Sequence, residues 1–192
     1  MRLTVALCCV STLCLAFLIL AWKVEIIRVS DSSMSPTLKN GDLLLTWKIT
    51  DNTAKKLKGR IIVFYFPFGD YGEEITLKED NIYIKRCSGC PGDTVFLSYP
   101  EIARPHLKRS DMIAQGPVVI PYKGYLIPIN DSTLNLYGKI IQYELNGENI
   151  RASERSYTFS GNYYFALGDS LGESFDSRHW GFIPESFLIS YK

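Results

Sequence analysis

The sequence is poor in several features on which large classes of protein depend. It contains two histidines, and its 21 basic and 20 acidic residues leave a net charge of only +1. A chain so balanced lacks the basic stripe of a nucleic-acid-binding protein, so we expect no nucleic-acid partner. We find no internal repeat and no low-complexity linker, which leaves one domain of ordinary size as the simplest organisation.

Cysteine is scarce in the part of the chain that follows residue 23. Cys87 and Cys90, in the motif C-S-G-C, are the only two there, and two cysteines cannot complete a structural zinc site. We therefore expect neither a metal nor another cofactor. The pair could form a small local disulfide in an oxidising compartment or remain as inert thiols. A thioredoxin-like redox role would require a βαβ context that the sequence lacks.

The N-terminal segment differs from the rest of the chain. Leu3–Trp22 is a run of 20 residues without a charge, and a helix of that length spans about 30 Å, enough to cross a bilayer. A cleaved signal peptide is the alternative, but the run is longer than the usual apolar stretch and lacks a small-residue cleavage site. We therefore predict a retained transmembrane anchor at residues 1–23 and one domain at residues 24–192. The flanking charges barely decide the orientation of the anchor.

Strand-like patterns dominate from residue 24 onward. Apolar alternation and short apolar runs between turn signals predict strands at residues 24–29, 43–47, 60–66, 81–87, 94–97, 157–159, 163–167 and 187–189. One helix is expected after Asn130, because apolar residues recur at helical spacing from Leu136 to Leu145. Asn146-Gly147 predicts a hairpin-type turn. The pattern indicates a mainly β domain built from bent antiparallel sheets.

Ser33 is a candidate nucleophile in the stretch S-D-S-S-M-S-P-T-L at residues 30–38. A serine hydroxyl needs a positioned base to take its proton, and histidine is the usual one. His106 lies in a charged stretch and is expected at the surface. A triad of Ser33, His179 and an aspartate is conceivable, but nothing nearby resembles the nucleophile elbow G-x-S-x-G.

Lys85 is a second candidate base. In the predicted strand around it, Ile82 and Ile84 share one face, and Tyr83, Lys85 and Cys87 share the other. Burial in a sheet would favour the neutral amine by lowering its pKa. The alternative is an ordinary strand lysine that is exposed at an edge or extends its ammonium to water.

An aromatic loop follows the strand at residues 60–66. Its exposed rings would be expected to contact something, either the core of the domain or the lipid interface beside the anchor. The residues concerned are Phe66, Phe68 and Tyr71.

Four segments, in this order, resemble bacterial type I signal peptidases, which are membrane-anchored serine proteases with a Ser–Lys dyad. They read S-M-S-P-T-L from Ser33, K-G-R-I-I-V-F from Lys58, Y-I-K-R-C-S-G-C-P-G-D from Tyr83 and F-A-L-G-D-S-L-G-E-S-F-D-S-R-H-W-G-F-I-P from Phe165. No single segment would be sufficient, but their joint order and spacing are highly specific. The resemblance covers about a third of the chain.

The resemblance implies a role for each matching residue. Ser33 would be the nucleophile and Lys85 the general base, with Ser174 hydrogen-bonded to the lysine and backbone N–H groups around Ser33 forming the oxyanion hole. Asp176 and Arg178 would form a supporting pair, although a surface ion pair is the simpler alternative. Gly168 and Asp169 would form the turn that shapes the site. Two shallow pockets for small residues at positions −1 and −3 of a signal peptide would be lined by Ile27, Val29, Met34, Leu38 and Ile84.

The resemblance also implies a setting for the enzyme. It predicts a signal-peptidase-like catalytic domain at residues 24–192, with a variable insertion at about 96–160. The chain would be a single-pass, monomeric protein of the cell membrane, its N-terminus cytoplasmic and its catalytic domain on the exported side. Its partners would be the lipid bilayer and the signal peptides of exported preproteins.

Departures from the family pattern leave alternatives open. Asp31 stands where the family often has serine or glycine, and its carboxylate would repel an oxyanion. Either Asp31 points away, or Ser32 or backbone donors suffice. Arg60 and Ser170 replace the acid and the asparagine typical of their segments. The chain could therefore be a general signal peptidase, a relative that matures a restricted substrate set such as a conjugation or secretion component, or an impaired homologue that only binds peptides.

Overall fold

The computed structural model describes residues 22–54, 56–67, 75, 77, 81–97, 116–151, 153–170 and 172–192. In that part of the chain, no helix is long and apolar enough to cross a bilayer. The predicted anchor at residues 1–23 lies almost entirely outside the described residues and stays a prediction. Phe68, Tyr71 and His106 also lie outside them.

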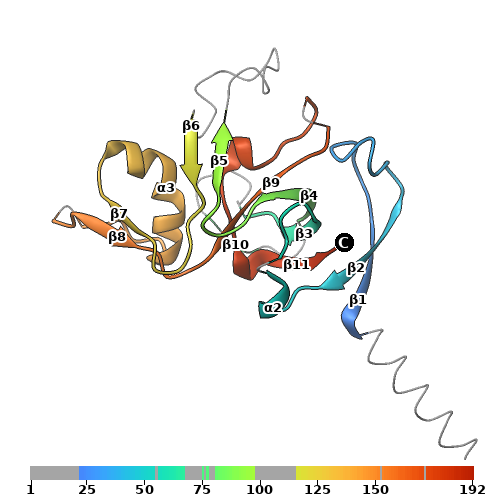
Figure 1. Cartoon of the computed structure of the whole chain (residues 1–192), viewed down its shortest axis with the longest axis horizontal. Helices are drawn as coiled ribbons and strands as arrows, with labels where there is room; N and C mark the ends of the chain where they lie inside the picture. Colours follow the sequence, from blue (N-terminus) through green and yellow to red (C-terminus); the bar gives the residue numbers. More distant parts are fainter. Residues whose placement is uncertain are drawn as a thin grey trace, which may run out of the picture.

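A seven-stranded antiparallel sheet forms the centre of the domain, in the order β1-β2-β11-β3-β4-β9-β10 (Figure 1). The prediction of a mainly β, antiparallel fold is therefore confirmed. The C-terminal strand β11 lies between β2 and β3, so the end of the chain joins the N-terminal hairpin to the rest of the sheet. The strands are β1 (Val24–Arg28), β2 (Leu43–Lys48), β3 (Ile61–Tyr65), β4 (Ile82–Gly89), β9 (Tyr163–Leu167), β10 (Ile183–Pro184) and β11 (Leu188–Tyr191).

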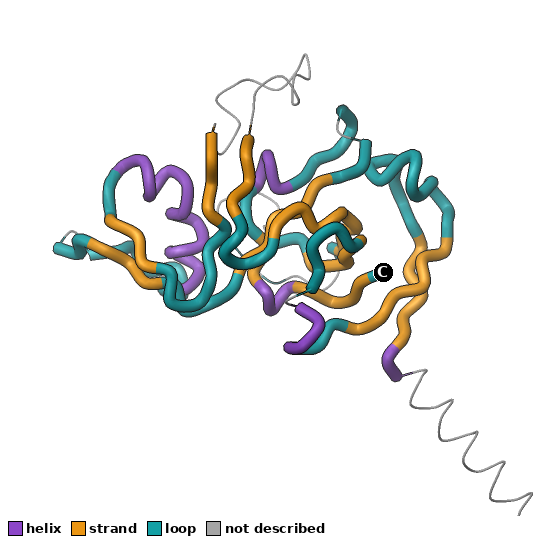
Figure 2. Tube along the Cα trace, viewed as in Figure 1, coloured by secondary structure: helices purple, strands orange, loops and turns teal. Residues whose placement is uncertain are grey.

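The elements between β4 and β9 form a separate group at the side of the sheet (Figure 2). Among the described residues, none of them adds a strand to the seven-stranded sheet. The predicted insertion at about residues 96–160, compared with other members of the family that the chain resembles, stays a prediction. The group consists of the pair β5 (Thr94–Leu97) and β6 (Gly116–Val119), the pair β7 (Leu126–Pro128) and β8 (Ser156–Thr158), and the helix α3 (Asp131–Glu144).

Helix α3 begins and ends through local side-chain and backbone chemistry. Asn130 is its N-cap and forms a capping box with Thr133, as its position before the apolar pattern predicts. The predicted hairpin turn at Asn146-Gly147 is wrong. Both residues have positive φ, and the Gly147 and Asn146 N–H groups donate to carbonyls of the last helical turn, which ends α3 in a Schellman motif.

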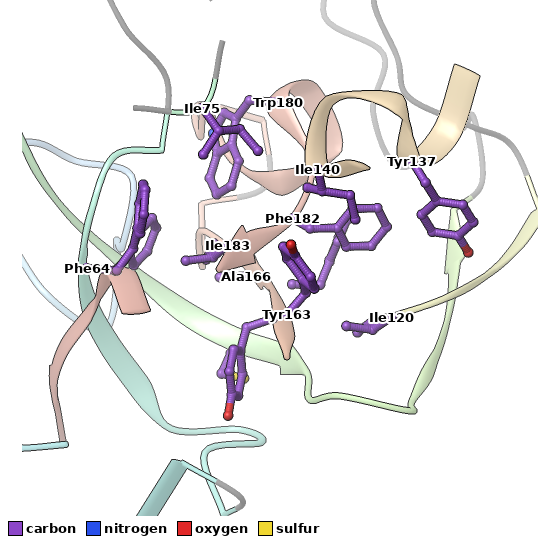
Figure 3. Close-up of a cluster of buried hydrophobic side chains, with 14 of the residues drawn as sticks. Phe64, Ile75, Ile120, Tyr137, Ile140, Tyr163, Ala166, Trp180, Phe182 and Ile183 are labelled. Carbon is purple, nitrogen blue, oxygen red and sulfur yellow. The ribbon is translucent and has the colours of Figure 1, made fainter. Parts of the chain in front are cut away.

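The sheet separates two apolar clusters, and neighbouring residues of β3 and β4 alternate between them. Ile62, Phe64, Tyr83 and Cys87 pack in the larger, aromatic cluster, in which Figure 3 shows Phe64 among other buried side chains. Ile61 and Val63 of β3 and Ile84 of β4 pack in the smaller cluster. Its members are Ile27, Val29, Met34, Leu38, Leu44, Ile61, Val63, Ile84 and Ile189. This confirms the predicted alternation of β4.

Of the aromatic loop, the structure describes the first ring. Phe66 stacks on Tyr83, with ring centroids 4.6 Å apart, and meets the edge of Trp180. At this residue, packing against the core is the correct alternative.

Candidate active site

Ser33 lies on the loop between β1 and β2. The loop is closed at its base by backbone hydrogen bonds between Val29 and Asp42 and between Gly41 and Val29. Met34 and Leu38 insert into the smaller apolar cluster and hold the loop against the sheet. Ser33 is consequently only 5% exposed, which is unusual for a serine on a loop.

Lys85 meets Ser33 from the middle of β4. The strand pairs with β3 on one side and β9 on the other, so that Lys85 is 2% exposed. Its Nζ donates to Ser33 Oγ at 2.6 Å and to the Ile84 carbonyl at 3.1 Å, and it lies 5.2 Å from the ring centroid of Tyr83. The structure thus brings together two residues that are 52 positions apart in the sequence.

Burial lowers the pKa of the Lys85 ammonium. Removal from water disfavours the charged form, and this effect outweighs the opposing influence of the Asp31 and Asp176 carboxylates. A lysine with a depressed pKa is neutral over more of the physiological pH range, and only the neutral amine can accept a proton from a hydroxyl.

Asp31 also contacts Ser33. Its Oδ1 accepts hydrogen bonds from the Ser33 backbone N–H at 2.9 Å and from Ser33 Oγ at 2.8 Å. The alternative in which Asp31 points away is therefore wrong. The Ser32 hydroxyl, the other candidate donor, instead donates to Glu173 Oε2 at 3.1 Å.

The histidine alternative is not formed. Hydrogen bonds of the Ser33 side chain go to Lys85 and Asp31. His179 lies on α4 (Ser177–Trp180), where its Nδ1 accepts from the Asp176 N–H at 3.2 Å and its ring stacks on Phe175. Of the two candidate bases, the structure places the lysine at Ser33.

Gly168 lets the segment after β9 approach the nucleophile loop. A Cβ at this position would overlap the Ser174 side chain and come within 2.6 Å of the Ser33 carbonyl oxygen. That carbonyl accepts from the Ser170 N–H at 2.9 Å. Position 168 therefore requires glycine because two segments meet there, a reason specific to this site.

Ser174 is buried beside this contact. Its side chain is 1% exposed, and its hydroxyl has no hydrogen-bond partner among the described residues. The hydrogen bond to Lys85 that the resemblance implies is thus absent from this structure. A buried hydroxyl without a partner lowers the stability of the fold. This hydroxyl lies near Gly168, as does the Ser33 carbonyl oxygen.

Asp176 and Arg178 form a buried pair, and the surface alternative is wrong. Both residues are almost fully shielded from solvent, at 0% and 3% exposed. Arg178 donates through Nε to Asp176 Oδ1 at 2.8 Å and through a terminal nitrogen to Oδ2 at 2.7 Å. Asp176 also accepts from the Gly168 N–H at 3.0 Å and caps α4, so that one carboxylate ties the end of β9 to the helix.

A second ion pair supports the same region. The sequence indicated its acid, Asp169, but not its base, Arg86. Arg86, next to Lys85 on β4, donates to both carboxylate oxygens of Asp169 at 2.8 and 2.6 Å. These hydrogen bonds lower the pKa of Asp169. The signal was available in the sequence, because Arg86 follows the candidate base directly in Y-I-K-R.

A pocket of about 470 Å³ opens beside Ser33. Its wall contains Asp31 and four of the five residues predicted to accept substrate, namely Ile27, Val29, Met34 and Ile84. The fifth, Leu38, packs in the apolar cluster beneath them. Among the described residues, no group of three or more metal-ligating side chains is close enough to hold an ion.

Cys87 and Cys90 are both free thiols, with their sulfurs 3.8 Å apart. The hydrogen bond between them lowers the pKa of Cys90 to about 7, helped by the backbone N–H groups of Lys58 and Leu57, and raises that of the buried Cys87. The predicted disulfide is not formed here and stays a prediction.

Sequence similarity places the chain among known proteins. A model of the family described as "Signal peptidase, peptidase S26" matches residues 2–191. The signal peptidase I of Bacillus caldolyticus is 32% identical over 185 residues, covering 96% of this chain and 82% of that protein. The signal peptidase I of Pseudomonas aeruginosa is 29% identical, covering 86% of this chain and 59% of that protein. That of Buchnera aphidicola subsp. Baizongia pistaciae is 24% identical, covering 92% and 71%.

These matches confirm the resemblance that the four sequence segments carry. The family match extends over nearly the whole chain and includes every residue of the site described above. Within the matched region, Lys85 of the antiparallel sheet contacts Ser33 of the β1–β2 loop. The chain therefore belongs to the signal peptidase family, peptidase S26, and is a serine endopeptidase, a hydrolase of peptide bonds.

Proposed function

We propose that this protein cleaves N-terminal signal peptides from exported preproteins, with Ser33 as nucleophile and Lys85 as general base. The observation that carries the proposal is the 2.6 Å contact between Lys85 Nζ and Ser33 Oγ, made where both residues are buried. This separation lies within the hydrogen-bond reach that proton transfer requires.

The reaction follows from the chemistry of these two groups. Neutral Lys85 takes the proton of Ser33 as Oγ attacks the scissile carbonyl carbon, and an ester forms as the amine leaves with a proton from Lys85. The lysine then takes a proton from a water molecule, which hydrolyses the ester and regenerates Ser33. Backbone N–H groups around Ser33 stabilise the oxyanion. Loss of one such donor raises the activation free energy by roughly 3–4 kcal/mol.

The substrate is recognised through small side chains. The wall of the pocket beside Ser33 combines polar side chains with the apolar Ile27, Val29, Met34 and Ile84. We propose that its apolar part accepts the small residues at positions −1 and −3.

A preprotein whose signal ends in Ala-X-Ala is expected to be cut after the second alanine. The same preprotein with leucine at −1 is expected to be cut at least about 100-fold more slowly, because the proposed −1 subsite accepts only small side chains. Mass spectrometry of the products measures both the site and the rate. Equal rates for the two preproteins would contradict the pocket assignment, and no cleavage of either would contradict the enzymatic proposal.

Two alternatives remain distinct outcomes of related experiments. A relative that matures a restricted substrate set would cut one class of exported protein and fail to restore growth of a signal-peptidase-depleted cell. A peptide-binding homologue would bind the preprotein without cutting it. The peptide-binding alternative is supported by the two hydrogen bonds that Asp31 accepts from Ser33.

The bilayer is the second proposed partner. The outward face of the β1–β2 hairpin is apolar, with Leu43 71% and Ile26 68% exposed and Leu45 directly across from Ile26. Trp47 of β2 and Trp22, which lies just before β1, are also exposed. Exposed apolar surface of this kind marks a contact site, and tryptophan favours the membrane interface. We accordingly propose a single-pass protein of the cell membrane, monomeric, with a cytoplasmic N-terminus and the catalytic domain on the exported side.

In the full chain reconstituted into vesicles, Trp47 is expected to be quenched by lipids brominated near the headgroup. The variant Trp22→Phe isolates its fluorescence from that of Trp22, and Trp180 is buried in the core. The matched control is the double variant Trp22→Phe/Trp47→Phe, whose remaining Trp180 should be insensitive to the bromine. If Trp47 is no better quenched than Trp180, the hairpin face does not touch lipid.

A further inference from the structure

The carboxylate of Asp31 occupies both hydrogen-bonding groups of Ser33 that catalysis would use. One oxygen, Oδ1, accepts from the backbone N–H at 2.9 Å and from the hydroxyl at 2.8 Å. The three-residue stretch from Asp31 to Ser33 thus forms a closed loop of hydrogen bonds around the nucleophile. The sequence motif does not specify this arrangement, because it contains no information on side-chain direction within a loop.

An oxyanion cannot share that N–H with a carboxylate. Oxyanion-hole donors act when they lie about 2.7–3.1 Å from the developing negative charge, and Asp31 Oδ1 already lies at such a distance from the Ser33 N–H. The carboxylate is itself negative, so it also repels the charge that the donor would stabilise.

The hydroxyl proton is also oriented unproductively. Ser33 Oγ donates to Asp31 while it accepts from Lys85, which is the reverse of the proton transfer from Ser33 to Lys85. For that transfer, the Ser33 hydroxyl has to turn from the carboxylate toward the amine.

We infer that Asp31 caps the nucleophile in the resting enzyme and that the scissile carbonyl of the substrate displaces it. The inference rests on the proposed function of Ser33. Asp31 is exposed, and it lines the pocket that the substrate would enter. The displaced carboxylate therefore has solvent to receive it, and the incoming peptide meets it first.

The charge of Asp31 also reaches Lys85. Asp31 and Asp176 both raise the pKa of Lys85 against the lowering effect of burial, while Arg178 neutralises much of Asp176 through its two hydrogen bonds. The ring of Tyr83 lies on the other side of the amine. Neutralising Asp31 is thus expected to lower the pKa of Lys85 further.

The kinetic test compares the wild type with four variants of Asp31 and one control variant, all as the full chain in vesicles. Asp31→Ala and Asp31→Ser are expected to raise kcat/KM for an Ala-X-Ala preprotein by about tenfold, the scale of one net charge-assisted hydrogen bond. Their pH profiles should rise at lower pH than that of the wild type. Asp31→Asn keeps an acceptor oxygen without the charge, so it should shift the profile with a smaller gain in rate, whereas Asp31→Glu should keep the wild-type profile. Asp42→Asn, in the same loop but without contact to Ser33, is the matched control.

A spectroscopic test does not depend on cleavage. Ser32-Ser33 is the only Ser-Ser pair in the sequence, so labelling serine with ¹³C at the carbonyl and ¹⁵N at the amide gives one HNCO signal, that of the Ser33 N–H. In detergent micelles this signal should lie downfield at neutral pH, as expected for a donor to a carboxylate, and move upfield in Asp31→Ala.

The two readouts separate the cap from the proposed function. If the wild type cleaves and Asp31→Ala cleaves no faster, the carboxylate is not a cap. If no variant cleaves any preprotein, the proposed function fails and the HNCO signal alone decides: an unchanged Ser33 signal in Asp31→Ala overturns the cap, and an upfield shift supports it.

Discussion

Lys85→Ala is expected to lower kcat for preprotein cleavage by roughly 10⁴-fold or more, and Ser33→Ala by at least as much. The reason is the 2.6 Å contact between the two side chains. Without the amine, the hydroxyl of Ser33 meets only the carboxylate of Asp31, and a carboxylate is a much weaker base than a neutral amine. In the proposed mechanism the two groups act as one unit, so the double variant should be no slower than the slower single variant. Single-turnover cleavage of a preprotein in vesicles measures all three rates.

Two controls isolate the chemistry from the fold. Lys85→Met retains an unbranched side chain in the buried site and should be as inactive as Lys85→Ala while unfolding at a similar or higher temperature, since it removes a buried amine. Lys123→Ala removes an exposed lysine on the loop before β7 and should cleave at the wild-type rate. Cleavage by Lys85→Met within tenfold of wild type would rule out Lys85 as the base.

The pH profile is a further readout of the same dyad. As the proposed base, Lys85 would act only as the neutral amine, whose fraction increases as pH rises through the pKa of the group. Burial lowers that pKa, partly opposed by Asp31 and Asp176, so kcat/KM should rise with pH and level off below the pH at which a lysine in water loses its proton. A rate that is flat from about pH 5 to 9 would contradict a lysine base.

Where local pattern determines structure, the sequence predicted it correctly. Alternation in Ile82–Cys87 places Lys85 on a defined face of β4, and both neighbouring strands then bury it. Helix α3 was expected from Asn130 and the apolar spacing after it, because capping and amphipathicity act within a few residues. The family segments identified the Ser33–Lys85 pair although 52 positions separate the two residues.

Where structure depends on distant packing or on side-chain direction, the sequence did not suffice. Asn146-Gly147 favours positive φ in a hairpin and at a helix end alike, and only the helix before it decides between them. Asp176 and Arg178 are two positions apart, a spacing that says nothing about burial. Asp31 could face Ser33 or solvent, because the hydrogen bonds that orient it form only once the loop is closed.

Asp176→Ala is expected to destabilise the fold by about 3–5 kcal/mol, the cost of breaking a buried ion pair by removing one partner. The substitution removes two hydrogen bonds from Arg178, whose side chain is almost completely buried. It also removes the acceptor of the Gly168 N–H and the N-cap of α4. Because Gly168 packs against Ser174 and approaches the Ser33 carbonyl, the loss should loosen the contact between the nucleophile loop and the segment after β9. Urea unfolding in detergent, followed by circular dichroism, measures the free energy of unfolding.

An exposed ion pair in the same sheet provides the matched comparison. Lys48 and Glu25 lie 3.4 Å apart with both side chains partly in solvent, and such pairs contribute at most about 1 kcal/mol. Glu25→Ala should therefore change the free energy of unfolding several-fold less than Asp176→Ala. Asp176→Asn, which preserves shape and the oxygen facing the Gly168 N–H, should fall between them. If Asp176→Ala and Glu25→Ala cost the same, the carboxylate of Asp176 does not hold the end of β9 to α4, and the rigidity of the Ser33 site must come from the sheet and the Arg86–Asp169 pair alone.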